Sequence, residues 1–153
     1  VTGALISGSF IPSVIHNGQS FHINDLDFYA PYGQGWEVLL YFVQSAGYSS
    51  DDLLTNYDAL PGLGRIRSAR LGDLKINVIE SRTQNARDAV LLHHSTIVMG
   101  TVCAEKVWLA YPALSHAGQA LMTRHTLLIH NDQESRMRAW VVIRKYVSRG
   151  FTF

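Results

Sequence analysis

Two aspartates two residues apart are the residues of this chain whose types and spacing most directly suggest chemistry. Asp25 and Asp27 lie in "NDLDFY", inside an apolar segment that predicts a β-strand over residues 21–30. Alternation along a strand places both carboxylates on one face, where like charges repel. A hard divalent cation, Mg²⁺ or Mn²⁺, would relieve that repulsion through oxygen ligands. The alternative left open is an exposed edge strand whose polar face simply carries acids.

A glycine-serine turn upstream supplies a second element of a site. Gly8 and Ser9 precede a short segment that we predict to be helical from Pro12. Glycine lets a phosphate approach the backbone, while N–H groups at a helix start and a serine hydroxyl can hold phosphate oxygens. A phosphate site beside a metal site predicts phosphoryl chemistry, which in two-metal sites usually needs a third carboxylate from a neighbouring strand.

These two motifs together resemble the signature of a known superfamily. "GS" at 8–9 followed by "DLD" at 25–27 resembles the DNA polymerase beta-like nucleotidyltransferases. Four stretches spread over nearly the whole chain are similar to nucleotidyltransferase-like proteins of basidiomycete fungi: "NDLDFYAPYGQG", "HHSTIVMG", "AYPAL" and "RKYVSRGFTF".

The resemblance implies a fold, a reaction and a set of roles. The fold would be α/β (α+β), a mixed β-sheet flanked by helices. Gly8 and Ser9 would hold the triphosphate of an NTP, and Asp25 and Asp27 would bind Mg²⁺ or Mn²⁺. The reaction would transfer a nucleoside monophosphate from the NTP to an acceptor that the sequence does not identify, because acceptor sites are built outside the shared motif.

The third acidic residue expected from the resemblance is an asparagine here. The best matching strand is "LKINVIES", and the aligned position is Asn77. An amide oxygen can ligate a metal weakly but cannot act as a base near neutral pH. Glu80 is a possible substitute, although strand alternation sends it to the face opposite Asn77. The sequence therefore leaves open a second function, a catalytically silent domain used for nucleotide sensing or protein interaction.

Length, composition and charge limit the other functions. The chain has 153 residues, enough for a single domain over 1–153, and its start at Val1 suggests a piece of a longer protein. Its charged fraction of 16% is low against roughly 25% in typical domains. A net charge of +1 indicates no electrostatic field for nucleic acid or an anionic membrane, so nucleic-acid binding through the basic C-terminal residues ranks last.

The single cysteine and the hydropathy pattern indicate a compartment. Cys103 has no partner for an internal disulfide, which favours a reducing intracellular location, cytoplasmic or nuclear. It also lacks a motif for nucleophilic catalysis, and we interpret it as a small core residue. No apolar run approaches the roughly 20 residues of a membrane-spanning helix, and no signal peptide is recognisable at the N-terminus.

The remaining elements follow from periodicity and turn residues. The sequence predicts elements over these ranges: a helix over 36–46, a hairpin over 65–81, a helix over 85–102 with a break near His94, a short strand over 104–112, a weak helix over 113–124, and a helix from Asn131 or Asp132 to Gly150. In the last helix we expect the core-facing positions to be Met137, Trp140, Val141, Ile143 and Val147.

Other residues that could suggest chemistry have simpler interpretations. His93 and His94 have no spaced set of metal ligands with them and are interpreted as structural histidines. The three arginines of "RIRSAR" are interpreted as a solvated hairpin arm, with a phosphate contact as the alternative. The tryptophans lie in amphipathic segments, where aromatic residues more often fill the core than stack on a base.

Overall fold

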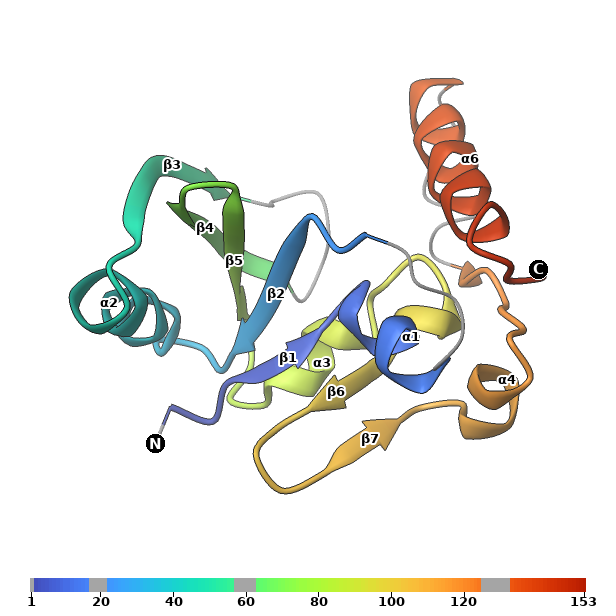
Figure 1. The fold of residues 1–153 in the computed structure, drawn as a ribbon, viewed down its shortest axis with the longest axis horizontal. Helices are drawn as coiled ribbons and strands as arrows, with labels where there is room; N and C mark the ends of the chain where they lie inside the picture. Colours follow the sequence, from blue (N-terminus) through green and yellow to red (C-terminus); the bar gives the residue numbers. More distant parts are fainter. Residues whose placement is uncertain (1, 17–21, 57–62, 125–132) are drawn as a thin grey trace.

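A mixed seven-stranded sheet organises the chain (Figure 1). The computed structural model describes residues 2–16, 22–56, 63–124 and 133–153. The strands are β1 (Leu5–Ser7), β2 (Asp25–Ala30), β3 (Ser49–Asn56), β4 (Leu63–Leu71), β5 (Leu74–Ser81), β6 (Gly100–Val102) and β7 (Val107–Leu109). Their order is β3-β4-β5-β2-β1-β6-β7; β2 and β5 pair in parallel, and the other neighbouring strands pair antiparallel.

Helices cover both faces of the sheet. They are α1 (Phe10–Ile15), α2 (Gly35–Ser45), α3 (Ala86–Val90), the 3-10 turn η1 (Thr96–Val98), α4 (Pro112–His116) and α6 (Gln133–Val147). The predicted α/β class, a mixed sheet flanked by helices, is therefore confirmed. Within the described ranges, no helix has the length and apolar character needed to cross a membrane.

The two faces of the sheet have separate cores. On one face, α2 packs against strands β2, β4 and β5 around Val38, Leu39, Ile76 and Val78. On the other, α3 packs against Tyr29 and Ile79 through its alanines and Val90. Because α3 has only five residues, it covers the part of this face near the end of β2 and leaves the start of the strand to polar residues.

Three predicted elements agree with the structure. The helix predicted over 36–46 is α2, displaced by one residue, and the hairpin predicted over 65–81 is formed by β4 and β5 with Gly72 in its turn at φ +58°. The strand predicted over 21–30 is β2, but it begins only at Asp25: residues 22–24 have no regular structure, and residue 21 lies outside the described residues.

The helix predicted over 85–102 is wrong beyond its first turns. Asn85 caps α3 by accepting a hydrogen bond from the Arg87 N–H, but the helix ends at Val90, and the chain continues as η1 and then β6. Gly100 explains part of the change. A Cβ there would lie 2.8 Å from both Ile11 Cγ2 and Leu109 Cδ2, so its small size permits the close approach of α1 and β7.

Two shorter elements were predicted too long. The strand expected over 104–112 is only Val107–Leu109, and the helix expected over 113–124 is the five-residue α4. Strands β1, β3 and β6 were not predicted. Strand β1 pairs with β2 and with the distant β6, and local pattern carries no information about the long-range pairing of β1 with β6. Strand β3 pairs with β4, the next strand along the chain, and β6 also pairs with the next strand, β7.

Helix α6 exists, but four of its five predicted core-facing residues are exposed, and the fifth, Ile143, is half-buried. Gln133–Val147 is helical, and Gly150 follows it at φ +86°; the predicted cap residues 131 and 132 lie outside the described residues. Trp140 is 58% exposed and Val141 is 65% exposed, and Met137 and Val147 are exposed as well. Tyr146 and Val142, one turn apart, instead pack against Ile97, Val98, Ala120 and Phe151. Among the α6 side chains that the structure describes, Val142 and Tyr146 thus attach the helix to the domain.

Candidate functional site

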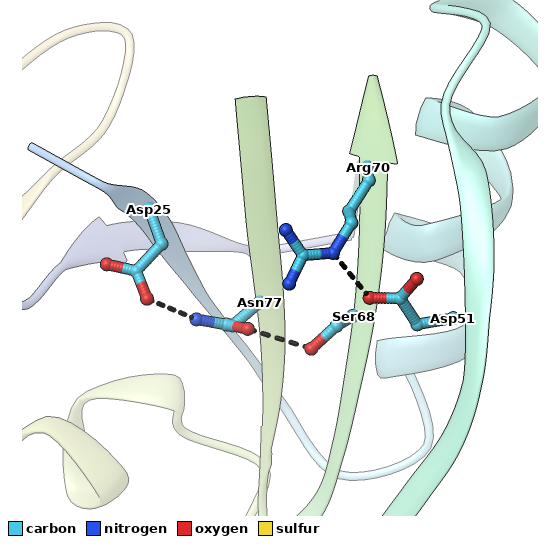
Figure 2. Close-up of polar contacts among 5 residues, drawn as sticks. All are labelled: Asp25, Asp51, Ser68, Arg70 and Asn77. Atoms are coloured by element: carbon cyan, nitrogen blue, oxygen red, sulfur yellow. Dashed lines mark hydrogen bonds and ion pairs between the residues drawn. The ribbon is translucent and has the colours of Figure 1, made fainter. Parts of the chain in front are cut away.

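Parallel pairing of β2 and β5 brings the predicted site residues together. Asp25 is opposite Lys75 and Asp27 is opposite Asn77, so all of these side chains project from one face of the sheet. The Asn77 Nδ2 donates to Asp25 Oδ2 at 3.0 Å (Figure 2). The same Nδ2 also donates to Asp27 Oδ1 at 2.9 Å. The residue aligned with the missing third carboxylate therefore lies in contact with both aspartates. We call Asp25, Asp27 and Asn77 the carboxylate-amide cluster.

Strand β4 fixes the orientation of the amide. Ser68 is opposite Asn77, and its Oγ donates to Asn77 Oδ1 at 2.8 Å (Figure 2). Further along the same row, Asp51 on β3 accepts a hydrogen bond from Arg70 Nε at 3.2 Å. Arg70 thus neutralises a third acid on this face, which stays outside the cluster.

The Gly8-Ser9 turn lies against Asp27. Strand β1 ends at Ser7, which is opposite Asp27, and Gly8 follows with φ +71°. A Cβ on Gly8 would press into Asp27 Oδ2, so only glycine fits both the backbone conformation and the space. Ser9 is buried at the N-cap of α1 and makes no side-chain capping bond. The structure thus brings four of the five predicted site residues into one contiguous group, with Ser9 next to it.

The electrostatics of Asp27 reflect its burial. Burial raises the pKa of Asp27 above its usual 3.8, and the charge of Asp25 raises it further. The hydrogen bond from Asn77 and the charges of Lys145 and Lys75 act in the opposite direction. Sequence reasoning missed Lys145, because its approach depends on how α6 packs against the domain, for which the helical pattern contains no signal.

The cluster offers oxygen ligands suitable for one hard cation. Asp25 and Asp27 supply carboxylate oxygens, and a rotation of the Asn77 amide would turn its carbonyl oxygen toward them and its NH₂ toward the Ser68 hydroxyl. These are the ligand types that Mg²⁺ and Mn²⁺ accept. Within the described ranges, no group of three His, Cys, Asp or Glu residues is arranged to hold a metal ion.

A shallow pocket adjoins the cluster. It has a volume of about 350 Å³ and is lined by residues from three strands: Asp27, Tyr29, Ile66, Ser68, Lys75, Asn77 and Ile79. Lys75 and Asn77 place a cation and an amide at the same opening. A phosphate-bearing ligand could therefore meet the Lys75 ammonium and a cation held by the carboxylates in one place.

Glu80 does not contribute to this cluster. It is opposite Ala30 on the face covered by α2, where its Oε2 accepts a hydrogen bond from the Gly35 N–H at 3.0 Å. Arg67 Nη1 lies 3.8 Å from the same oxygen. The prediction that alternation separates Glu80 from Asn77 is confirmed.

The histidines and the cysteine have structural positions. His93 Nε2 lies 3.0 Å from the Tyr29 hydroxyl, and burial lowers the pKa of His93 to about 3 and that of His94 to about 4. Both histidines are therefore neutral near pH 7, as expected for structural residues. Cys103, predicted to be a small core residue, is instead partly exposed beside β6, where its Sγ lies 3.6 Å from the Lys106 carbonyl oxygen.

Comparison with known proteins assigns this chain to no family. No family model, no curated protein and no solved structure matches the chain. The fold and the site define an α/β protein in which a parallel strand pair carries two carboxylates and one amide next to a glycine turn.

Proposed function

We propose that this domain binds a Mg²⁺–NTP complex at the carboxylate-amide cluster and transfers the nucleoside monophosphate to an acceptor hydroxyl. The observation that carries the proposal is the contact of Asp25, Asp27 and the Gly8 turn, which the resemblance assigns to metal and triphosphate. Asp25 and Asp27 lie on β2, Gly8 directly follows β1, and Asn77, which bonds both aspartates, lies on β5, so only the folded sheet assembles the group.

The roles follow from the chemistry of each group. Asp25 and Asp27 would hold Mg²⁺, which when bound stabilises negative charge on phosphate oxygens. Gly8 allows the triphosphate to approach the backbone, and Ser9 supplies a hydroxyl. Lys75, at the mouth of the same pocket, supplies a positive charge. Asn77 orients the two carboxylates but cannot remove a proton from the acceptor.

The second candidate function is nucleotide binding without turnover, for sensing or for interaction with another protein. It is favoured by the hydrogen bonds that Asn77 donates to both aspartates, because an amide that links the carboxylates stabilises the cluster without a metal. In an active member of the resembled superfamily, an acid would occupy this place and would need a cation to offset its charge.

Calorimetry with each of the four NTPs, with and without Mg²⁺, tests binding. We expect Mg²⁺-dependent binding that is lost when Asp25→Asn and Asp27→Asn are combined. The matched control is Asp51→Asn, which removes an acid from the same face but outside the cluster and should leave binding unchanged. Absence of NTP binding in the parent protein, or equal loss in the control, would contradict the proposal.

Asn77→Asp separates transfer from silent binding. If the parent protein transfers nucleotide from a labelled NTP to any acceptor supplied, the silent alternative is wrong. If the parent only binds and Asn77→Asp gains transfer, the site is that of an enzyme that lost its third acid. Asn77→Ala is the control, since it removes the amide without adding a carboxylate and should gain no activity.

A further inference from the structure

A second pocket lies on the other face of the sheet, away from the carboxylate-amide cluster. It has a volume of about 590 Å³, within the range of small-ligand sites. Its lining includes Arg67 and Glu80, which project toward α2, and Trp36 from the first turn of α2. The cluster projects from the opposite face, so the two sites do not share side chains.

Arginine dominates the charge of this pocket. Three guanidinium groups, those of Arg65, Arg67 and Arg82, line it together with one carboxylate, Glu80. The carboxylate is already engaged, because it accepts the Gly35 N–H and pairs with Arg67. The excess of positive charge suits an anion, and guanidinium groups match phosphate oxygens in geometry as well as charge.

Arg67 carries a buried donor that no described residue satisfies. The residue is only 8% exposed, yet its Nη1 has no hydrogen-bond partner, and the distance of 3.8 Å to Glu80 Oε2 is too long for a hydrogen bond. A buried donor without an acceptor costs free energy, about 1–3 kcal/mol for a neutral group and more for a charged one. An oxygen of a ligand in this pocket would supply the acceptor.

Two exposed aromatic rings lie at the same pocket. Tyr32 is 58% exposed and Trp36 is 50% exposed, and both line it. The Arg67 guanidinium lies over the Trp36 ring, with Cζ 5.8 Å from the ring centroid. Exposed aromatic rings beside arginines form a surface on which a planar base can stack while its phosphate meets the guanidinium groups.

We infer that this pocket binds a nucleoside phosphate unit, with its base against Trp36 and Tyr32 and its phosphate against Arg65, Arg67 and Arg82. Neither Mg²⁺ nor the two aspartates take part. A free nucleotide and a nucleotide within a single strand carry the same unit, so the chemistry of recognition is common to both. The inference does not depend on the proposed function, because it uses none of the same residues.

Calorimetry of the full chain in EDTA tests the inference. The ligands are AMP, CMP, GMP and UMP, a 5′-phosphorylated tetraribonucleotide, and the two halves of the unit, adenosine and inorganic phosphate. We expect at least one mononucleotide or the tetranucleotide to bind. The substitution Trp36→Ala, or the pair Arg65→Ala with Arg82→Ala, should weaken the affinity for that ligand by roughly tenfold or more. These side chains are exposed, so the variants should fold.

Matched controls distinguish binding at this pocket from non-specific electrostatic binding and from binding at the carboxylate-amide cluster. Trp140→Ala and Arg144→Ala remove an exposed indole and an exposed guanidinium on α6, and Asp25→Asn alters the cluster; each should leave the affinity unchanged. Binding of the tetranucleotide alone would support the inference and identify a strand as the source. Failure of every nucleotide to bind, equal binding of inorganic phosphate, or equal loss in the α6 controls would overturn it.

Discussion

At the scale of single residues, Asn77 stabilises two carboxylates that would otherwise repel each other. Its NH₂ group has two hydrogens, and each is donated to a different aspartate, while its carbonyl oxygen accepts from Ser68. Every polar atom of the amide is thus engaged, and the hydrogen bond to Asp27 offsets part of the effect of burial and of the Asp25 charge on the pKa of that carboxyl. The same amide could ligate a metal only after rotation, so metal binding and this network compete for the two aspartates.

The pKa of Asp27 should respond to Asp25. Carboxyl ¹³C NMR titration in EDTA should give Asp27 a pKa above 3.8, and Asp25→Asn should lower it, because one of the causes that raises it is the Asp25 charge. The pKa should still exceed 3.8 in the variant, since burial is the largest cause. Asp51→Asn is the control and should not move it. An unchanged pKa in Asp25→Asn would show that the two carboxylates do not interact.

The same pKa shift has a consequence for stability. Because the folded state holds the Asp27 proton more tightly than the unfolded chain does, this group favours folding most below pH 3.8. That contribution is lost as the pH rises through the folded-state pKa. At the proposed Mg²⁺ site, a bound cation would favour the ionised carboxylates of the folded state. On that proposal, addition of Mg²⁺ at neutral pH should raise the free energy of unfolding of the parent protein, and much less that of Asp25→Asn.

Gly8 should tolerate no side chain. Gly8→Ala places a methyl group against Asp27 Oδ2 on a backbone with φ +71°, so both strain and overlap should destabilise the fold. Gly47→Ala is the matched control, because Gly47 has φ +74° and no atom within 4 Å of its added Cβ. Urea denaturation should show Gly8→Ala to be less stable than Gly47→Ala by about 1–3 kcal/mol. Equal losses would mean that the turn has room beside Asp27.

At the scale of secondary structure, alternation in β2 and β5 could be predicted, but register could not. The pattern around Asp25 and Asp27 correctly placed both on one face, and it correctly separated Glu80 from Asn77. That β5 pairs in parallel with β2, which places Asn77 opposite Asp27, depends on a crossover through β3 and β4. Two strands distant in sequence give no local signal of their pairing, so this part came from the resemblance and not from periodicity.

For helix α6, the element itself could be predicted from the sequence, but the side that it buries could not. Its existence and its end near Gly150 follow from local residues, whereas its buried side does not. Apolar residues occur all around the helix, and Tyr146 and Val142 are buried because the C-terminal segment with Phe151 packs there. The position of Lys145 near Asp27 depends on that docking. A charge that acts on the site was therefore invisible in the sequence.

His93 and His94, which follow α3, should make the stability of the fold sensitive to acid. The pKa of His93 is lowered to about 3 and that of His94 to about 4, both from 6.5, so the folded state keeps them neutral. The unfolded chain binds protons below pH 6.5, and stability should fall as the pH drops from there, by about 1.4 kcal/mol per pH unit for each group.

Denaturant unfolding at pH 7 and pH 5 measures this effect. His93→Gln keeps a polar partner for the Tyr29 hydroxyl but cannot titrate, so the stability difference between the two pH values should shrink by about half. Adding His94→Gln should remove most of the remainder. The raised pKa of Asp27 makes stability increase as the pH falls, opposite to the effect of the histidines. The test therefore compares variant with parent instead of using the absolute dependence of the free energy of unfolding on pH. A difference unaffected by either substitution would rule out the histidines as its source.

At the scale of the whole molecule, the short strand β1 joins two parts of the sheet. On one side, β2, β5, β4 and β3 form an extended ladder, and on the other lies the small β6-β7 hairpin. Strands β1 and β6 pair at Ile6, which lies opposite Val102. Ser7 reinforces this pairing, because its Oγ lies 2.6 Å from the Gly100 carbonyl oxygen and 3.3 Å from that of Val98. Ser7 directly precedes Gly8, so the same few residues position the glycine turn and attach the hairpin.

Ser7→Ala should therefore loosen one side of the sheet and the glycine turn together. The substitution removes the single O–H that donates to the Gly100 carbonyl oxygen at 2.6 Å and also lies near that of Val98, at a cost of about 1–3 kcal/mol. Hydrogen exchange followed by NMR should show faster exchange for amides of β6 and β7, with the β4-β5 ladder protected as in the parent. Ser13→Ala is the control, since its hydroxyl bonds only within α1, to the Phe10 carbonyl oxygen at 2.6 Å. Uniform loss of amide protection over all strands would contradict this and would mean that the β6-β7 hairpin and the β2-β5-β4-β3 ladder unfold as one unit. The position of Asp27 would then depend on the β6-β7 hairpin.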